Sequence, residues 1–125
     1  MYMQAGTVVC FERTFTKEDV LQFAVLSGDR GNHHMIPDEQ GRLMAQGLLT
    51  ATLPTKIGGD YNFIAREIKF TFLRPVFTGD IIRCEVTVDE TEQENGRLNV
   101  LSSFFCVNQH GKEVLNGKFK GVILQ

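Results

Sequence analysis

Two side chains that can transfer protons stand five residues apart in the first third of the chain. Asp29 carries a carboxylate and His34 an imidazole, and both lie within residues 26–47. Gly47 then opens an apolar segment whose spacing predicts a helix. A carboxylate and an imidazole beside a helix N-terminus can move a proton to or from water next to a carbonyl group. We therefore expect residues 26–47 to carry the chemistry and the rest of the chain to position them.

Each of these residues also has a simpler interpretation. A loop aspartate such as Asp29 can cap its own backbone, and Gly47 can be a glycine required by close packing. Asp29, His33, His34 and Asp38 could form a metal site, but no further histidine or thiolate is indicated as a ligand. We expect His33 to be a solvent-facing neighbour, and we expect no metal.

The composition is typical of a globular protein with one domain, residues 1–125. Of the 125 residues, 42% are hydrophobic, and the net charge of −2 comes from mixed charges. No segment approaches the ~20 apolar residues of a spanning helix, and no basic stripe indicates nucleic-acid binding. The N-terminal residues show no secretory signal. Cys10, Cys84 and Cys106 form neither a disulfide framework nor a paired metal motif, so we expect reduced, buried thiols in a cytoplasmic protein.

Hydrophobic periodicity predicts the elements that position this segment. Strands are expected at residues 7–15, 64–72, 81–89, 97–108 and 112–124, and helices at 17–26 and 45–57. Thr16 and Asp19 have the spacing of a capping box for the first helix, and Gly28 should end it. The second helix is apolar on almost every side and should therefore be buried. Pro54 should kink or shorten it, and Gly58-Gly59 should end it.

The predicted elements define a fold of the α+β class. Asn95-Gly96 predicts a hairpin turn, the last four strands are expected to be joined by short turns, and Ile64, Ile68 and Phe70 are expected to share one face of their strand with Phe72. A helix that is apolar all round needs a sheet to wrap it. We therefore expect a single hotdog fold, in which a curled antiparallel β-sheet wraps around a long central helix. A symmetric dimer would cover the open sheet edge.

Four segments of the chain resemble the MaoC-like hotdog dehydratases, the group that contains the (R)-specific enoyl-CoA hydratases. The group's loop pattern Ser-Gly-Asp-x-Asn-Pro-x-His corresponds to SGDRGNHH at residues 27–34, and its His-Gly-Met-Leu motif to QGLL at residues 46–49. Its Pro-Val-x-x-Gly-Asp turn matches residues 75–80, and its Asn-Gln-x-Gly hairpin matches residues 108–111. The chain departs from the pattern at Gly31, Asn32 and Gln46, where the group has Asn, Pro and His.

The resemblance implies a lyase of fatty acid metabolism that reversibly adds water to a trans-2-enoyl thioester of coenzyme A or acyl carrier protein. It assigns Asp29 and His34 to catalysis and the backbone N–H of Gly47 to the thioester oxygen. Asn32 and Thr55 would contribute to substrate binding. The reaction needs no metal or redox cofactor, since coenzyme A enters only as part of the substrate. The implied assembly is a homodimer or an oligomer built from dimers.

Two other functions are compatible with a hotdog scaffold. Acyl-CoA thioesterases use a carboxylate near the helix to activate water, but no Asp or Glu lies within the predicted helix at residues 45–57. This difference favours the lyase. A non-catalytic acyl-CoA-binding subunit stays open because of the departures at Gly31, Asn32 and Gln46.

Overall fold

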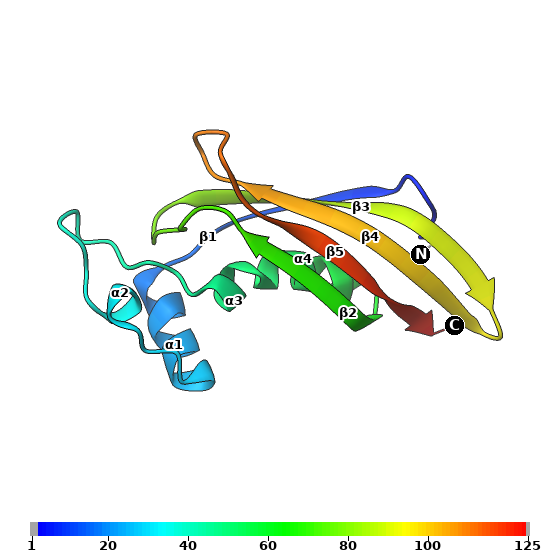
Figure 1. Cartoon of the computed structure of the whole chain (residues 1–125), viewed down its shortest axis with the longest axis horizontal. Helices are drawn as coiled ribbons and strands as arrows, with labels where there is room; N and C mark the ends of the chain where they lie inside the picture. Colours follow the sequence, from blue (N-terminus) through cyan, green and yellow to red (C-terminus); the bar gives the residue numbers. More distant parts are fainter. Residues whose placement is uncertain (1–2, 125) are drawn as a thin grey trace.

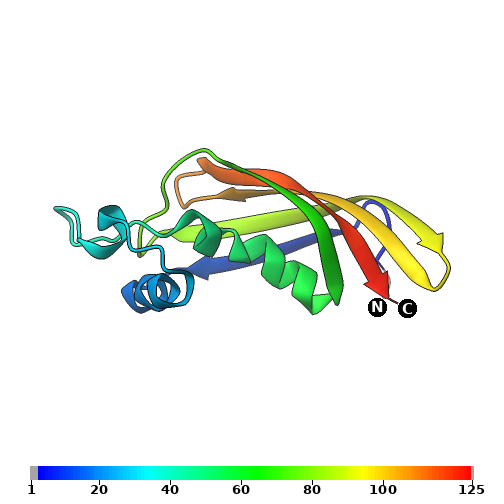
Figure 2. The ribbon, with the colours of Figure 1, turned by 60° about the horizontal axis from the view of Figure 1, so that its bottom comes forward.

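An antiparallel sheet curls around a helical segment in the computed structural model, which describes residues 3–124. The elements in chain order are β1 (Val8–Thr14), α1 (Lys17–Ser27), α2 (Asn32–Met35), α3 (Gly47–Thr50), α4 (Thr52–Asp60), β2 (Phe63–Phe72), β3 (Ile81–Glu94), β4 (Arg97–Val107) and β5 (Glu113–Leu124). The five strands lie in the order β1-β3-β4-β5-β2, and each neighbouring pair is antiparallel. Helices α3 and α4 run along the concave face of the sheet, and α1 and α2 lie at one end (Figures 1 and 2). The predicted α+β class and wrapped sheet are confirmed.

The connection between β2 and β3 differs from the prediction. Tight turns join β3 to β4 and β4 to β5, and Asn95 and Gly96 take the positive φ angles of 43° and 78° that the hairpin turn requires. Strand β2, however, pairs with β5 at the sheet edge, so residues 73–80 must pass β5 and β4 to reach β3. Hydrogen bonds from Ala45 N to Val76 O and from Thr78 N to Leu43 O hold this connection against the loop before α3.

Helix α1 begins and ends where the sequence predicts. Asp19 N donates to Thr16 Oγ1 over 3.1 Å, and Thr16 N donates to Asp19 Oδ2 over 2.9 Å, which completes the capping box. Gly28 ends the helix with φ of 80°, a conformation that favours glycine. The next residue is Asp29, so the helix end fixes where the candidate site starts.

The predicted central helix consists of two segments, α3 and α4, with Ala51 between them. Pro54 cannot donate to the carbonyl of Thr50, the residue four before it, and α3 ends at Thr50, so the predicted kink takes the form of this break at Ala51, without a shortening of the last turn. Gly58 and Gly59 do not end α4, which continues to Asp60. Neither glycine has a positive φ, so nothing in their backbone conformation interrupts the helix.

A β-bulge in β2 changes which side chains share one face of this strand. The register with β5 shifts between Ala65 and Glu67, which leaves Arg66 as the extra residue. Before the bulge Phe63 packs on the core and Ile64 is 49% exposed, whereas Phe70 faces the core after it. The prediction that Ile64 shares the face of Phe70 is therefore wrong, because the bulge reverses the alternation of side chains.

The core lies between the concave sheet face and the helices. The predicted inward residues of β3 are all buried, namely Ile82, Cys84, Val86 and Val88. Cys84 lies opposite Cys106 in β4. The hydrogen bond with the Cys84 thiol, together with burial, raises the pKa of Cys106. Cys10 is exposed on β1, so the expectation of buried thiols is wrong for this residue. Among residues 3–124, no helix is long and apolar enough to span a membrane.

Candidate active site

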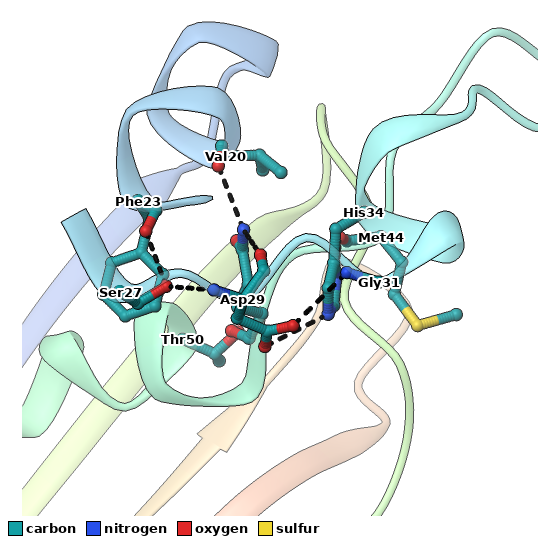
Figure 3. A network of polar contacts seen from close by, with 9 residues as sticks. Val20, Phe23, Ser27, Asp29, Gly31, His34, Met44 and Thr50 are labelled. Carbon is teal, nitrogen blue, oxygen red and sulfur yellow. Dashed lines mark hydrogen bonds and ion pairs between the residues drawn. The ribbon is translucent and has the colours of Figure 1, made fainter. Parts of the chain in front are cut away.

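Asp29 and His34 face each other across the short loop that follows α1 (Figure 3). Gly28 turns the chain out of α1, and the single turn of α2 brings His34 back toward the loop. The distance from His34 Nε2 to Asp29 Oδ2 is 3.5 Å. The side chain of His34 is 6% exposed and that of Asp29 is 51% exposed. A fixed imidazole therefore stands beside a carboxylate that solvent reaches.

A backbone carbonyl fixes the protonation pattern of the His34 ring. His34 Nδ1 lies 2.6 Å from Met44 O, and because a carbonyl oxygen only accepts, Nδ1 must carry the hydrogen. In the neutral ring, Nε2 then presents its lone pair toward Asp29. An ionised Asp29 carboxylate also only accepts, so the two groups can share a proton or the hydrogens of one water. This arrangement suits proton transfer.

The backbone of Asp29 is anchored by Ser27. Asp29 N donates to Ser27 Oγ over 3.0 Å, and Ser27 Oγ donates to Phe23 O over 2.7 Å. Gly31 N also lies 3.4 Å from Asp29 Oδ1, so Asp29 does cap its own loop weakly. Its other oxygen, Oδ2, remains directed at His34. Capping and a catalytic role are therefore compatible in this geometry.

Gly47 lies in an open groove beside the pair. The groove has a volume of about 470 Å³, and its lining includes His34, Gly47, Thr50 and Phe72. No residue between positions 3 and 124 accepts a hydrogen bond from Gly47 N. A Cβ atom at Gly47 would lie 2.9 Å from Phe72 Cε1, so the ring also packs closely against this glycine. The two interpretations of Gly47 do not conflict.

Two further residues from the sequence prediction lie away from this groove or at its margin. Asn32 is exposed at the start of α2 and is two residues from His34. Thr55 donates to Thr52 O over 3.0 Å and lines a different, apolar cavity of about 100 Å³ together with Phe63. The structure thus places His34 and Gly47 in one groove and Asp29 beside His34, but it does not bring Thr55 to them.

Three contributors to the site were missed from the sequence. Thr50 is buried, lines the groove and lies one helical turn beyond Gly47, so helical spacing could have revealed it. Met44 contributes only its carbonyl, and Phe72 comes from a strand distant in sequence. Neither of these two had a local signal.

The alternative metal site has no geometric support in the part of the chain that the structure describes. Asp38 pairs with Arg42 at 2.9 Å, and the backbone N–H of Arg42 lowers the pKa of the Asp38 carboxyl. The His33 ring packs against the His34 ring at 3.8 Å between centroids. Among residues 3–124, no group of three or more His, Cys, Asp or Glu side chains could hold a metal ion.

The fold of the chain is the hotdog fold of solved structures that include two (R)-hydratases and a MaoC-like dehydratase from Rhodospirillum rubrum. No protein-family model and no curated protein matches the chain. An (R)-hydratase from A. caviae involved in PHA biosynthesis has a TM-score of 0.85 at 23% identity, with 98% of each chain covered. The R-hydratase PhaJ1 from Pseudomonas aeruginosa has a TM-score of 0.82 at 24% identity, covering 98% of this chain and 82% of that one. A monoamine oxidase regulatory protein from Archaeoglobus fulgidus has a TM-score of 0.82 at 27% identity, covering 98% and 92%.

Proposed function

We propose that the chain is a hydratase/dehydratase that reversibly adds water to a trans-2-enoyl thioester and gives a 3-hydroxyacyl thioester. The observation that carries this proposal is the 3.5 Å approach of His34 Nε2 to Asp29 Oδ2 beside the groove that contains Gly47. The similarity in fold to two (R)-hydratases supports it. The substrate would be a thioester of coenzyme A or of acyl carrier protein.

In this proposal, one water molecule binds between Asp29 and His34. One of the two side chains takes a proton from the water while the water oxygen forms a bond to C3 of the substrate. The C2–C3 π bond breaks, and the pair delivers a proton to C2. The proton removed from water equals the proton added to carbon, so Asp29 and His34 return to their starting state. The proposed step needs no metal or redox cofactor, because it combines proton transfers with formation of one C–O bond and involves no net change in oxidation state.

Negative charge develops on the thioester oxygen during this addition. The N–H of Gly47 is the proposed donor to that oxygen, since none of the residues described accepts from it. A well-placed donor of this kind typically contributes ~10²–10³-fold in rate. Thr50, which is buried in the same groove, donates its hydroxyl to Gln46 O over 3.4 Å and supports the chain just before Gly47.

A thioesterase mechanism is less well supported by the geometry. It needs a carboxylate positioned near the helical segment to direct water at the thioester carbon. Within α3 and α4 the one carboxylate is Asp60 at the far end of α4, and it pairs with Lys56 at 2.6 Å. Asp29, by contrast, stands with an imidazole partner.

The test is an assay with trans-2-enoyl-CoA thioesters of increasing chain length. We expect loss of enoyl absorbance without release of thiol. Asp29→Asn and His34→Asn should each lower the rate by ~10²–10⁴-fold, whereas Asp38→Asn, in an exposed loop held by Arg42, should not. Thiol release would instead indicate a thioesterase, and no reaction with any thioester would indicate a non-catalytic acyl-CoA-binding subunit. A cytoplasmic location belongs to the same proposal.

We also propose that the chain forms a homodimer through the free edge of β2. This strand is ten residues long and has no neighbouring strand on one side within residues 3–124, and Ile68 and Phe72 are 38% and 53% exposed. A strand edge of this kind presents unpaired backbone N–H and C=O groups, so it is normally covered or paired with another strand. Antiparallel pairing of two β2 strands centred on Ile68 would place Glu67 opposite the partner subunit's Lys69. That contact would offset the repulsion that Lys69 experiences from Lys118, its direct neighbour in β5.

A further inference from the structure

Gln46 is a buried polar residue between α1, the Asp29 loop and α3. Its side chain is completely buried. Its Nε2 donates to Val20 O over 3.0 Å and lies 3.4 Å from Asp29 O. One amide group thus joins three parts of the chain that are distant in sequence. Gln46 is also the residue directly before Gly47.

The two contacts determine which way the amide faces. Both partners are carbonyl oxygens, which only accept, so the NH₂ group must be the one directed at them. The other end of the amide, Oε1, is buried and has no hydrogen-bond partner among residues 3–124. An unpartnered buried carbonyl lowers stability, so a residue needed only to fill this space would be better replaced by an apolar side chain of the same length. The polar side chain is accounted for by its donor group.

We propose that Gln46 is a positioning residue that holds Asp29 at a fixed place relative to Gly47 and His34. The inference rests on the proposed hydratase function. Asp29 O and the Asp29 carboxylate belong to the same residue, so a restraint on the carbonyl limits where the carboxylate can lie. Ser27 anchors the same residue from the side of α1 through Asp29 N. The two anchors together hold both polar groups of the Asp29 backbone.

The variant Gln46→Met removes the donor and keeps the length of the side chain. We expect kcat for hydration of a short trans-2-enoyl-CoA to fall by ~10²-fold with little change in KM, because a misplaced catalytic group affects the chemical step. Backbone amides of residues 28–34 should exchange hydrogen about tenfold faster, since their loop loses a restraint. Gln46→His keeps an N–H donor at a similar reach and should restore both properties in large part.

The matched control is Ile82→Val, a fully buried core change in β3. It lowers stability but should leave kcat and the exchange of residues 28–34 unchanged. Unchanged exchange of this segment in Gln46→Met would overturn the proposal, whatever the activity. If the wild-type chain does not hydrate enoyl thioesters, the proposed function fails, and the exchange comparison still tests the restraint by itself. If Gln46→Met does not fold, Gln46→Asn, whose donor is one methylene shorter, must show the same loosening.

Discussion

The aromatic ring of Phe72 lies directly against Gly47. A Cβ atom added to Gly47 would stand 2.9 Å from Phe72 Cε1 and 3.2 Å from Cδ1 and Cζ, which is closer than carbon atoms pack. Phe72 is nevertheless 53% exposed, so its ring can move outward. The last residue of β2 therefore forms one wall of the groove above the first residue of α3.

This contact makes Gly47→Ala a sensitive test of the groove. We expect a loss of less than about 1 kcal/mol in the free energy of unfolding, because the exposed Phe72 ring can move outward to make room for the methyl group. The rate of enoyl-thioester hydration should fall, since the displaced ring changes the wall of the groove beside the proposed N–H donor. Phe72→Leu in the same chain should recover most of the stability. An unchanged rate of hydration in Gly47→Ala would contradict the packing described here.

The charges on β2 predict how the proposed dimer responds to substitution. Lys69→Glu should improve the contact with Lys118 within the chain but place two acidic residues opposite each other across the interface. We expect about tenfold weaker dimerisation from the two symmetric contacts, measured by sedimentation. Adding Glu67→Lys to Lys69→Glu should restore the affinity. A tighter dimer in Lys69→Glu would rule out the register centred on Ile68.

Two glycines should respond in opposite ways to alanine. A Cβ at Gly117 in β5 would collide with Lys69 O of β2 and lie 2.8 Å from Phe104 Cζ, whereas a Cβ at Gly59 in α4 meets nothing within 4 Å. Gly117→Ala should lower the free energy of unfolding by about 2 kcal/mol or more. Gly59→Ala should raise it by about 0.5–1 kcal/mol, because alanine is the better helix former. Urea unfolding of both variants measures the contrast, and equal effects would refute it.

The capping box of α1 predicts a pH-dependent contribution to stability. Hydrogen bonding from the Thr16 N–H, aided by the Thr16 hydroxyl and by Arg13, holds the pKa of Asp19 below its ordinary value of 3.8. A carboxyl whose pKa is lowered in the folded state contributes stability that is fully present above the pKa of the unfolded chain. This contribution is lost as the pH falls through the lower pKa of the folded state. Asp19→Asn should therefore be less stable than wild type at neutral pH, with a difference that shrinks in acid. Thr16→Ala should lower the free energy of unfolding by about 1 kcal/mol near pH 7. A difference in stability between Asp19→Asn and wild type that persists at pH 2 would contradict this account.

Features that depend on a few adjacent residues could be predicted from the sequence. Thr16 and Asp19 cap α1, Gly28 ends it, and Asn95-Gly96 turns β3 into β4, each as predicted. The spacing of Asp29 and His34 also identified the loop in which the candidate pair lies. These signals are local because a cap or a tight turn is stabilised by hydrogen bonds between near neighbours.

Features that depend on partners distant in sequence could not be predicted and became visible in the folded chain. Pairing with β5 created the bulge at Arg66 that turns Ile64 outward, and the path of the helical segment placed Thr50 rather than Thr55 in the groove. The carbonyl of Met44, which orients His34, comes from a loop ten residues away. No local pattern encodes these contacts, because each forms only when segments remote in sequence pack together and their hydrogen-bonding groups must find partners.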